Sequence, residues 1–238
     1  MQKFCKAGLF VFIMVAMAGV TTWAAPPKDS GQAKGPGPGW GFKRISNTDP
    51  KLPRILLVGD SIANGYHKRV AELLKGKANV DLYITPKNVA SRDAAKDLEA
   101  VLVKYGPYRV IHFNESGLHA WQKDAVAEGK YGPLFAKYLK DLQEHAGQAT
   151  LIWATSTPVT IKDKPGELDA EVDATVMAHN DAARKIIEEQ KIAVDDLHAL
   201  MMDKLKLARG DRFHWTAAGF NVLADAVAQN IDKALKSQ

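Results

Sequence analysis

The chain has 238 residues, of which 46% are hydrophobic and 25% are charged, and its formal net charge at pH 7 is +5. These values are typical of a globular protein with one domain of ordinary size. A charge excess this small gives no argument for nucleic-acid binding, and no nucleic-acid partner is expected.

Residues 1–24 have the pattern of a secretory signal peptide. Two lysines precede an uncharged apolar run over residues 7–20, and a Thr-Trp-Ala sequence that ends at Ala24 places small residues at both positions that matter for cleavage. The apolar run is short for a full membrane span. We therefore expect cleavage after Ala24 and an exported product, periplasmic or secreted, that keeps no stable membrane anchor.

Cleavage at this point would change the chemistry open to the mature chain. It removes two lysines and no acidic residue, so the formal charge falls from +5 to +3, and it removes Cys5, the only cysteine. The mature chain could then form no internal disulfide. A cysteine nucleophile and a cysteine-ligated metal site are both excluded.

Residues 25–51 form a segment rich in proline, glycine and polar residues, without a hydrophobic period. Such a composition predicts a flexible leader. Its last part, residues 40–45, contains aromatic and apolar side chains that could pack on the domain. The domain itself is predicted over residues 52–238.

From residue 52 onward, short apolar runs alternate with segments of helical periodicity. The predicted strands are residues 55–58, 80–84, 110–113 and 151–154, with a weaker fifth at 192–194, and the predicted helices are residues 62–74, 92–105, 134–145, 170–190 and 217–235. This alternation predicts a parallel sheet covered by helices on both faces. In such sheets, functional residues gather just beyond the carboxyl ends of the strands.

Ser61 meets this condition, because it comes three residues after the first predicted strand. A serine hydroxyl is a poor nucleophile at neutral pH and needs a histidine base, itself oriented by a carboxylate. His214, just before the last helix, has Asp211 three residues earlier. This spacing lets the carboxylate accept a hydrogen bond from one imidazole nitrogen and leaves the other nitrogen to face Ser61.

Two other known motifs that follow a strand, one with a serine and one with spaced glycines, match residues 59–65 less well. The nucleophile elbow of the α/β-hydrolases has a second glycine where this chain has Ala63, and its acid lies well upstream of the histidine. The dinucleotide-binding fingerprint requires three spaced glycines that residues 59–65 lack.

Two segments of the chain match a known family. The sequence VGDSIANG, residues 58–65, resembles block I of the SGNH (GDSL-type) hydrolases, and DRFHWTAAGF, residues 211–220, resembles their block V. The similarity extends over roughly residues 54–231. It implies a three-layer α/β/α sandwich of flavodoxin-like type and ester hydrolysis through an acyl-enzyme, without a cofactor.

The resemblance also assigns roles to individual residues. Ser61 is implied as the nucleophile, His214 as the base and Asp211 as the residue that orients it. The backbone N–H of Ser61 is implied as one donor to the oxyanion of the tetrahedral intermediate.

The remaining oxyanion donors depart from the family pattern. Block II supplies a glycine N–H, and here Ala90 takes that place. Block III reads Gly-x-Asn-Asp, and here residues 117–120 read GLHA, with His119 in place of the asparagine. A neutral imidazole can donate one hydrogen bond to an oxyanion, as an amide can. Asn114 is the alternative donor, and a packing role for His119 stays open.

A metal site built from His112, Glu115 and His119 is a minor alternative. Since His112 lies inside the third predicted strand, its side chain should point into a layer of the fold, and no further ligand converges with it. We therefore expect no metal.

These residues favour an exported serine esterase that removes a small acyl group, such as acetyl, from a carbohydrate. The carbohydrate part of this hypothesis depends on export, on the lack of a long hydrophobic segment for a lipid groove, and on the habit of the family. The alternatives are a lipase, lysophospholipase or thioesterase with the same machinery, and a non-catalytic carbohydrate-binding relic of the fold. The expected partner is a small-molecule or glycan ester.

Overall fold

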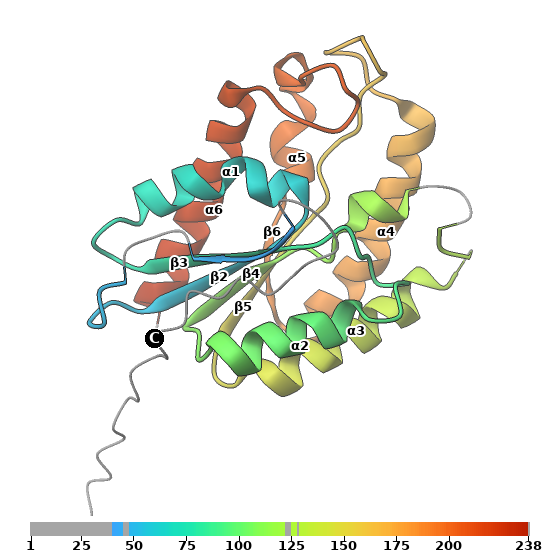
Figure 1. The fold of residues 1–238 in the computed structure, drawn as a ribbon. Coiled ribbons are helices and arrows are strands. Elements are labelled where there is room, and N and C mark those ends of the chain that lie inside the picture. Colours follow the sequence, from blue (N-terminus) through green and yellow to red (C-terminus); the bar gives the residue numbers. More distant parts are fainter. Residues whose placement is uncertain (1–39, 45–47, 122–124, 128, 238) are drawn as a thin grey trace, which may run out of the picture.

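The computed structural model describes residues 40–44, 48–121, 125–127 and 129–237. The predicted signal peptide and most of the predicted leader lie outside the described residues. Within them, six strands form one sheet in the order β1-β3-β2-β4-β5-β6 (Figure 1). The strands are β1 (Gly41–Arg44), β2 (Arg54–Gly59), β3 (Asn79–Ile84), β4 (Val110–Phe113), β5 (Thr150–Ala154) and β6 (Ala193–Asp195).

The sheet is parallel except at one edge. Strands β2 to β6 pair in parallel, as predicted, whereas β1 pairs antiparallel with β3, with Gly41 opposite Ile84. Residues 41–44 belong to the last part of the predicted leader, for which the sequence allows packing on the domain, and they do so as a strand rather than as flexible chain. The short sequence Gly-Phe-Lys-Arg has little strand pattern of its own, but the free edge of β3 supplies hydrogen-bonding partners for its backbone.

The helices also agree with the predicted pattern, with ends that differ by up to three residues. They are α1 (Ser61–Leu73), α2 (Ala94–Tyr105), α3 (Tyr131–Ala146), α4 (Ala170–Glu189), α5 (Leu197–Met202) and α6 (Ala217–Lys236), with short 3₁₀ turns η1 (Gly117–Ala120) and η2 (Leu205–Leu207). The helix α5 and both 3₁₀ turns were not predicted. In the described part of the chain, no helix is both long enough and apolar enough to cross a membrane.

Side-chain caps fix where several helices begin. Asp60, Asp169, Asp196 and Thr216 each accept a hydrogen bond from a backbone N–H in the first turn of α1, α4, α5 and α6. Such caps satisfy donors that the helix itself leaves unpaired.

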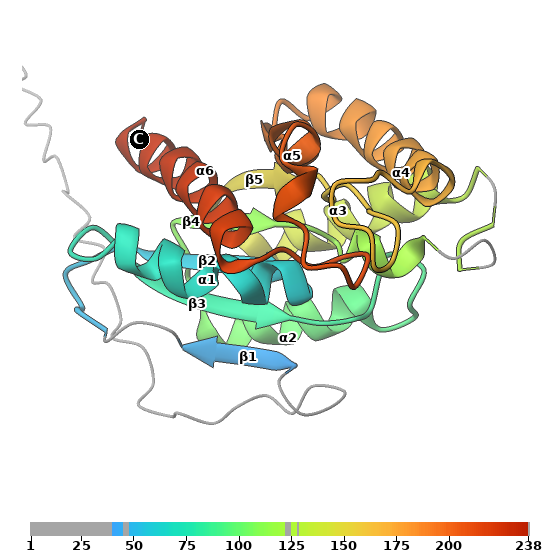
Figure 2. The same cartoon turned by 90° about the horizontal axis from the view of Figure 1, so that it is seen from above.

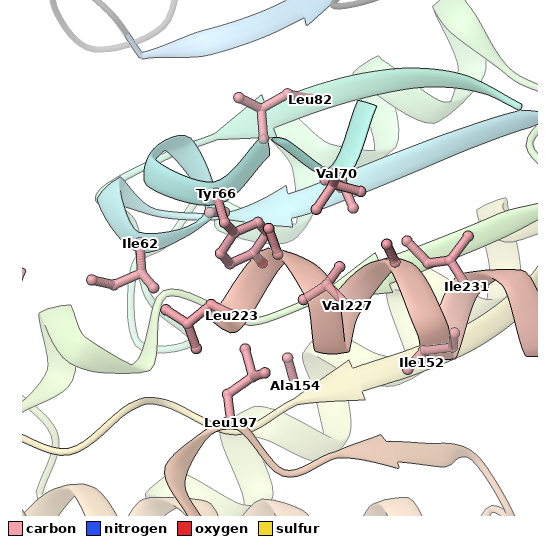
Figure 3. Close-up of a cluster of buried hydrophobic side chains, with 14 of the residues drawn as sticks. Ile62, Tyr66, Val70, Leu82, Ile152, Ala154, Leu197, Leu223, Val227 and Ile231 are labelled. Atoms are coloured by element: carbon pink, nitrogen blue, oxygen red, sulfur yellow. The ribbon is translucent and has the colours of Figure 1, made fainter. Parts of the chain in front are cut away.

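The three layers of the fold are visible in Figures 1 and 2: α1 and α6 lie on one face of the sheet, and α2 and α3 lie on the other. Two hydrophobic clusters fill the spaces between the layers. Figure 3 shows the first cluster, in which Tyr66 of α1 and Val227 of α6 meet Ile152 of β5 and Leu197 of α5. The packing of α1 on α6 places the segments at their N-terminal ends side by side.

A buried hydrogen bond connects the side chains of one residue in β4 and one in β6. The fully buried His112 lies with its Nε2 at 2.9 Å from Oδ2 of Asp195. The sequence Val-Asp-Asp-Leu at 194–197 has the composition of a surface turn, but it forms the end of β6 and the start of α5. Asp195 is buried as the partner of His112, and Asp196 caps α5.

Candidate active site

The candidate site lies at the carboxyl edge of the parallel strands. Ser61 is the first residue of α1, and Asp60 alone separates it from the end of β2. The chain leaves β2 for β3 on one side and then crosses to β4 on the other side. This reversal of strand order is the position where sheets of this type open a crevice for ligands.

The turn that presents Ser61 is held by Asp60. The Oδ1 atom of Asp60 accepts a hydrogen bond of 2.9 Å from the N–H of Ile62, and its carbonyl accepts one of 3.0 Å from the N–H of Asn64. These bonds begin the helix at Ser61 and leave the first N–H groups of α1 pointing toward the edge of the sheet.

Three residues from distant parts of the chain form a continuous hydrogen-bonded series. The Oγ atom of Ser61 lies 2.9 Å from Nε2 of His214, and Nδ1 of His214 lies 2.9 Å from Oδ2 of Asp211. The other oxygen of Asp211 accepts a hydrogen bond of 2.9 Å from the backbone N–H of His214. The three side chains are therefore positioned as the sequence motifs predict, and the serine and histidine are both partly exposed.

The loop that carries Asp211 and His214 is fixed on both sides. Arg212, between them, has a positive φ of 86°, and its carbonyl accepts a hydrogen bond of 3.0 Å from the N–H of Thr160. A β-bridge joins Ala208 to Trp215, and Thr216 then caps α6. A residue other than glycine persists at positive φ only where its surroundings impose that conformation, and these contacts impose it here.

The electrostatics of this loop keep Asp211 ionised. Partial burial alone would raise its pKa, but hydrogen bonds from the backbone N–H of His214, from Arg209 and from the His214 ring outweigh burial and lower the pKa of Asp211 to about 2. An ionised carboxylate at this position fixes the tautomer of the imidazole and stabilises the imidazolium form.

Two of the three predicted oxyanion donors are already engaged in other hydrogen bonds. The N–H of Ala90, the predicted block II donor, donates to Oδ1 of Asn88 at 2.9 Å. The side-chain amide of Asn114 donates to the Ala154 carbonyl at 2.8 Å, and its oxygen accepts from the N–H of Gly117 at 3.1 Å. Asn114 thus holds the ends of β4 and β5 to η1.

His119, the third candidate, lies on η1 with its backbone fixed and its side chain partly exposed. Its carbonyl accepts a hydrogen bond of 2.9 Å from the amide of Asn88. Its Nε2 lies 4.0 Å from Oδ2 of Asp60, the neighbour of Ser61. The ring of Trp40 meets the His119 ring edge-on, with 5.8 Å between centroids.

Sequence reasoning missed two residues at this site. Trp40 follows a run of proline and glycine, and it directly precedes β1, whose Gly41 pairs with the carboxyl end of β3. Nothing in the sequence marks Asp60 as more than a brace for the turn after β2. Its burial, with 3% of its surface exposed, raises the pKa of its carboxyl, although His119 and the N–H of Ile62 act in the opposite direction.

The residues of the alternative metal site do not converge. His112 is bound to Asp195, and the buried Glu115 accepts hydrogen bonds from the Tyr131 hydroxyl at 2.5 Å and from the Trp153 indole at 2.8 Å. Among the residues that the structure describes, no group of three His, Cys, Asp or Glu side chains could hold a metal ion.

Comparisons with known proteins show structural similarity to solved esterases at low sequence identity. No protein-family model matches the sequence, and no curated protein matches it. A solved carbohydrate acetylesterase family member from Sinorhizobium meliloti is similar, with a TM-score of 0.60 and 14% identity over 78% of this chain and 100% of that chain. An acetyl xylan esterase from Geobacillus stearothermophilus has a TM-score of 0.56 and 18% identity, over 75% of this chain and 94% of that chain.

A further acetyl xylan esterase has a TM-score of 0.57 and 18% identity, over 75% of this chain and 99% of that chain. At these identities the comparison concerns the fold alone. The chain has the three-layer fold of the SGNH hydrolases, as the sequence blocks predict.

Proposed function

We propose that this chain is an exported serine esterase of the SGNH type, which hydrolyses carboxylic esters through an acyl-enzyme and removes small acyl groups such as acetyl from carbohydrate. The observation that carries the proposal is the series from Ser61 to His214 to Asp211, with 2.9 Å at each step. A serine whose hydroxyl faces a histidine, which is in turn oriented by an ionised carboxylate, is the arrangement that activates a hydroxyl for attack.

In the first half of the proposed reaction, Ser61 Oγ attacks the ester carbonyl carbon while His214 Nε2 takes the hydroxyl proton. The carbonyl oxygen becomes an oxyanion, which the backbone N–H of Ser61 and the side chain of His119 stabilise together with the positive end of α1. His214 then gives its proton to the alcohol oxygen as the C–O bond breaks. The alcohol leaves, and Ser61 keeps the acyl group.

In the second half, His214 Nε2 takes a proton from a water molecule as the water oxygen attacks the acyl carbon. The second tetrahedral intermediate collapses when His214 returns the proton to Ser61 Oγ, and the carboxylic acid leaves. Asp211 stays ionised throughout and stabilises the imidazolium that forms in each half.

Two observations support a carbohydrate ester as the substrate. The solved structures with the same fold include acetyl xylan esterases and a carbohydrate acetylesterase family member. Two partly buried tryptophans flank the site: Trp40 beside His119, and Trp121, which packs on Phe213 of the catalytic loop with 5.7 Å between ring centroids. Flat aromatic surfaces of this kind suit the apolar face of a sugar ring.

Export is proposed on the sequence pattern of residues 1–24. N-terminal sequencing of the mature protein, purified from the culture or the periplasm of an expressing bacterium, tests it. A mature chain that begins at Ala25 is expected, and a product that retains residues 1–24 in the cytoplasm contradicts it.

The decisive test of the chemistry is labelling with a fluorophosphonate probe, which reacts with activated serines. The wild-type protein should be labelled, with the adduct on Ser61 by peptide mass spectrometry, and both Ser61→Ala and His214→Ala should abolish labelling. Ser237→Ala, at the far end of α6, is the matched serine control and should label fully. A folded wild-type protein that takes up no probe contradicts the proposal.

A panel of esters then tests the substrate. Acetyl esters of an oligosaccharide and of a simple aryl alcohol should be hydrolysed faster than aryl esters with acyl chains of eight carbons or more. A preference for long chains would instead assign the chain to the lipases or thioesterases. Glycan binding without turnover, unchanged in His214→Ala, would assign it to the non-catalytic carbohydrate-binding class.

A further inference from the structure

The carboxylate of Asp60 has one oxygen that the turn does not use. Its Oδ1 caps α1, whereas its Oδ2 is buried and has no hydrogen-bond partner in the described part of the chain. An unsatisfied buried acceptor is destabilising. A helix cap does not need a carboxylate, since serine, threonine and asparagine cap equally well. The presence of an aspartate at this position therefore calls for another explanation.

His119 is placed to supply the missing partner. Its Nε2 lies 4.0 Å from Oδ2 of Asp60, which is longer than an N–H···O hydrogen bond by about 1 Å. The carbonyl of His119 is bound by Asn88, so its backbone is fixed, but its side chain is 35% exposed and has room to rotate. A shift of the His119 side chain by about 1 Å would bring the two atoms within hydrogen-bond distance.

The other titratable groups near this pair cannot serve as its cation. His214, from the loop before α6, must be neutral to act as the base. Glu115, from the end of β4, is an acid that Tyr131 and Trp153 already satisfy. Tyr66, from α1, stays protonated because burial raises its pKa. Among the described residues that face Asp60, His119 is the group left to carry a positive charge.

We propose that Asp60 is a positioning residue that holds His119 as an imidazolium, so that the second N–H of the ring gives the oxyanion a charged hydrogen-bond donor. This inference rests on the proposed esterase function. With Nε2–H directed to Asp60, the proton on Nδ1 is the one that faces the substrate. Hydrogen bonds with a charged donor are roughly twice as strong as neutral ones.

The charges of the tetrahedral intermediate are consistent with this role. When His214 has taken the serine proton, two imidazolium rings stand beside two carboxylates, those of Asp60 and Asp211. The guanidinium of Arg209, which also donates to Asp211, is a third positive charge, and it balances the charge of the oxyanion. An asparagine donor, which the family has at the position of His119, is neutral and would need no such counter-ion.

Two substitutions separate the charge of this pair from its shape. Asp60→Asn removes the charge but keeps a residue that caps α1, and His119→Asn replaces the ring by a neutral donor. The profile of kcat/KM against pH for an aryl acetate is measured for the wild-type protein, both single variants and the double variant. The double-mutant design isolates the interaction between the two residues.

The wild-type profile should fall on the alkaline side as His119 loses its proton. In Asp60→Asn this fall should move to lower pH, and kcat/KM at pH 8 should drop by about 10–100-fold, comparable to weakening one oxyanion donor. His119→Asn should lack the alkaline fall, and adding Asp60→Asn to it should change kcat/KM by less than about 3-fold. If Asp60→Asn lowers kcat/KM equally in the wild-type protein and in His119→Asn, the inference is overturned.

Nuclear magnetic resonance of the imidazole nitrogens gives a readout that does not depend on turnover. The His119 signals, identified by their loss in His119→Asn, should show two protonated ring nitrogens at pH 7 in the wild-type protein and one in Asp60→Asn. A neutral His119 ring in the wild-type protein at pH 7 overturns the inference. If the probe still labels Ser61 in that case, the esterase proposal stands without it.

Discussion

Gly59 at the end of β2 and Ala63 in the first turn of α1 lie in such close contact that a Cβ atom on Gly59 would stand 2.7 Å from the Cβ atom of Ala63. Both residues are buried, and both belong to rigid elements on either side of Ser61. The strand-to-helix turn that presents the candidate nucleophile therefore depends on the missing side chain at position 59.

Gly59→Ala should have a larger effect on kcat than on the stability measured by thermal unfolding. The added methyl group must push the start of α1 away from β2 and lengthen the 2.9 Å distance between Ser61 Oγ and His214 Nε2. A displacement near 1 Å at a reacting group can reduce the rate by about 100-fold. Steady-state kinetics with an aryl acetate, combined with thermal unfolding, measures both effects.

The matched control for this prediction is the double variant Gly59→Ala/Ala63→Gly. It removes the opposing methyl group at a cost of about 1 kcal/mol in helix propensity. Activity should recover at least partly, although stability falls. If the double variant is no more active than Gly59→Ala, close contact between these residues does not position Ser61.

Asp211→Asn should lower kcat by about 10²–10⁴-fold while leaving the fold intact. An amide can present an N–H to the histidine and favour the wrong tautomer, and it cannot stabilise the imidazolium by charge. The fluorophosphonate labelling rate should fall in parallel. Asp203→Asn, at an exposed aspartate after α5, is the matched control. Unchanged kcat in Asp211→Asn would remove this residue from the mechanism.

Asp211 should also contribute to stability in acid. Its pKa in the folded chain, about 2, lies below the value of about 3.9 for an unfolded chain. The contribution is therefore present above about pH 4 and is lost as the pH falls toward 2. Unfolding temperatures measured across this range should decline less steeply in Asp211→Asn, and parallel curves for the two proteins would contradict the low pKa.

Tyr131→Phe should destabilise the protein through Glu115. The change removes the hydroxyl that donates to the buried carboxylate but keeps a ring that can stack on His179. Loss of one partner of a buried acceptor costs about 1–3 kcal/mol in the free energy of unfolding. Urea unfolding gives this value directly.

The effect of Tyr131→Phe should depend on pH. Burial raises the pKa of Glu115, so its stabilising contribution is complete below the unfolded value of about 4.3 and is lost as the pH rises through the folded value. The hydroxyl of Tyr131 partly offsets this loss, so its removal should cost more at pH 7.5 than at pH 4. Adding Glu115→Gln should remove the difference, and an equal cost at both values would contradict the assignment.

The parts of the site that could be predicted from the sequence are those encoded by local spacing. Ser61 follows a buried apolar run and precedes a helix, and Asp211 and His214 share one short loop. The contact between Ser61 and His214 spans 153 residues, and it was expected from the resemblance to the SGNH sequence blocks. The core strands and long helices were predictable for the same reason, because their periodicity is local.

The remaining features depend on partners that are distant in the sequence or on backbone hydrogen bonds. The role of Asp195 becomes visible only beside His112, which lies 83 residues away. The N–H of Ala90 is engaged because Asn88 folds its side chain back on the backbone. The unused oxygen of Asp60 could be recognised only once its burial and its hydrogen bonds were known.

The antiparallel pairing of β1 decides where a shortened version of this protein could begin. Composition alone would place the start at residue 52, but a chain that begins there lacks residues 41–44 and leaves the backbone of β3 as an uncovered outer edge. Uncovered edges of this kind pair readily with other chains and promote aggregation. Such a chain would also lack Trp40. A loss of activity could then come either from self-association or from the missing ring beside His119. The smallest unit suitable for kinetic work therefore begins at or before residue 40.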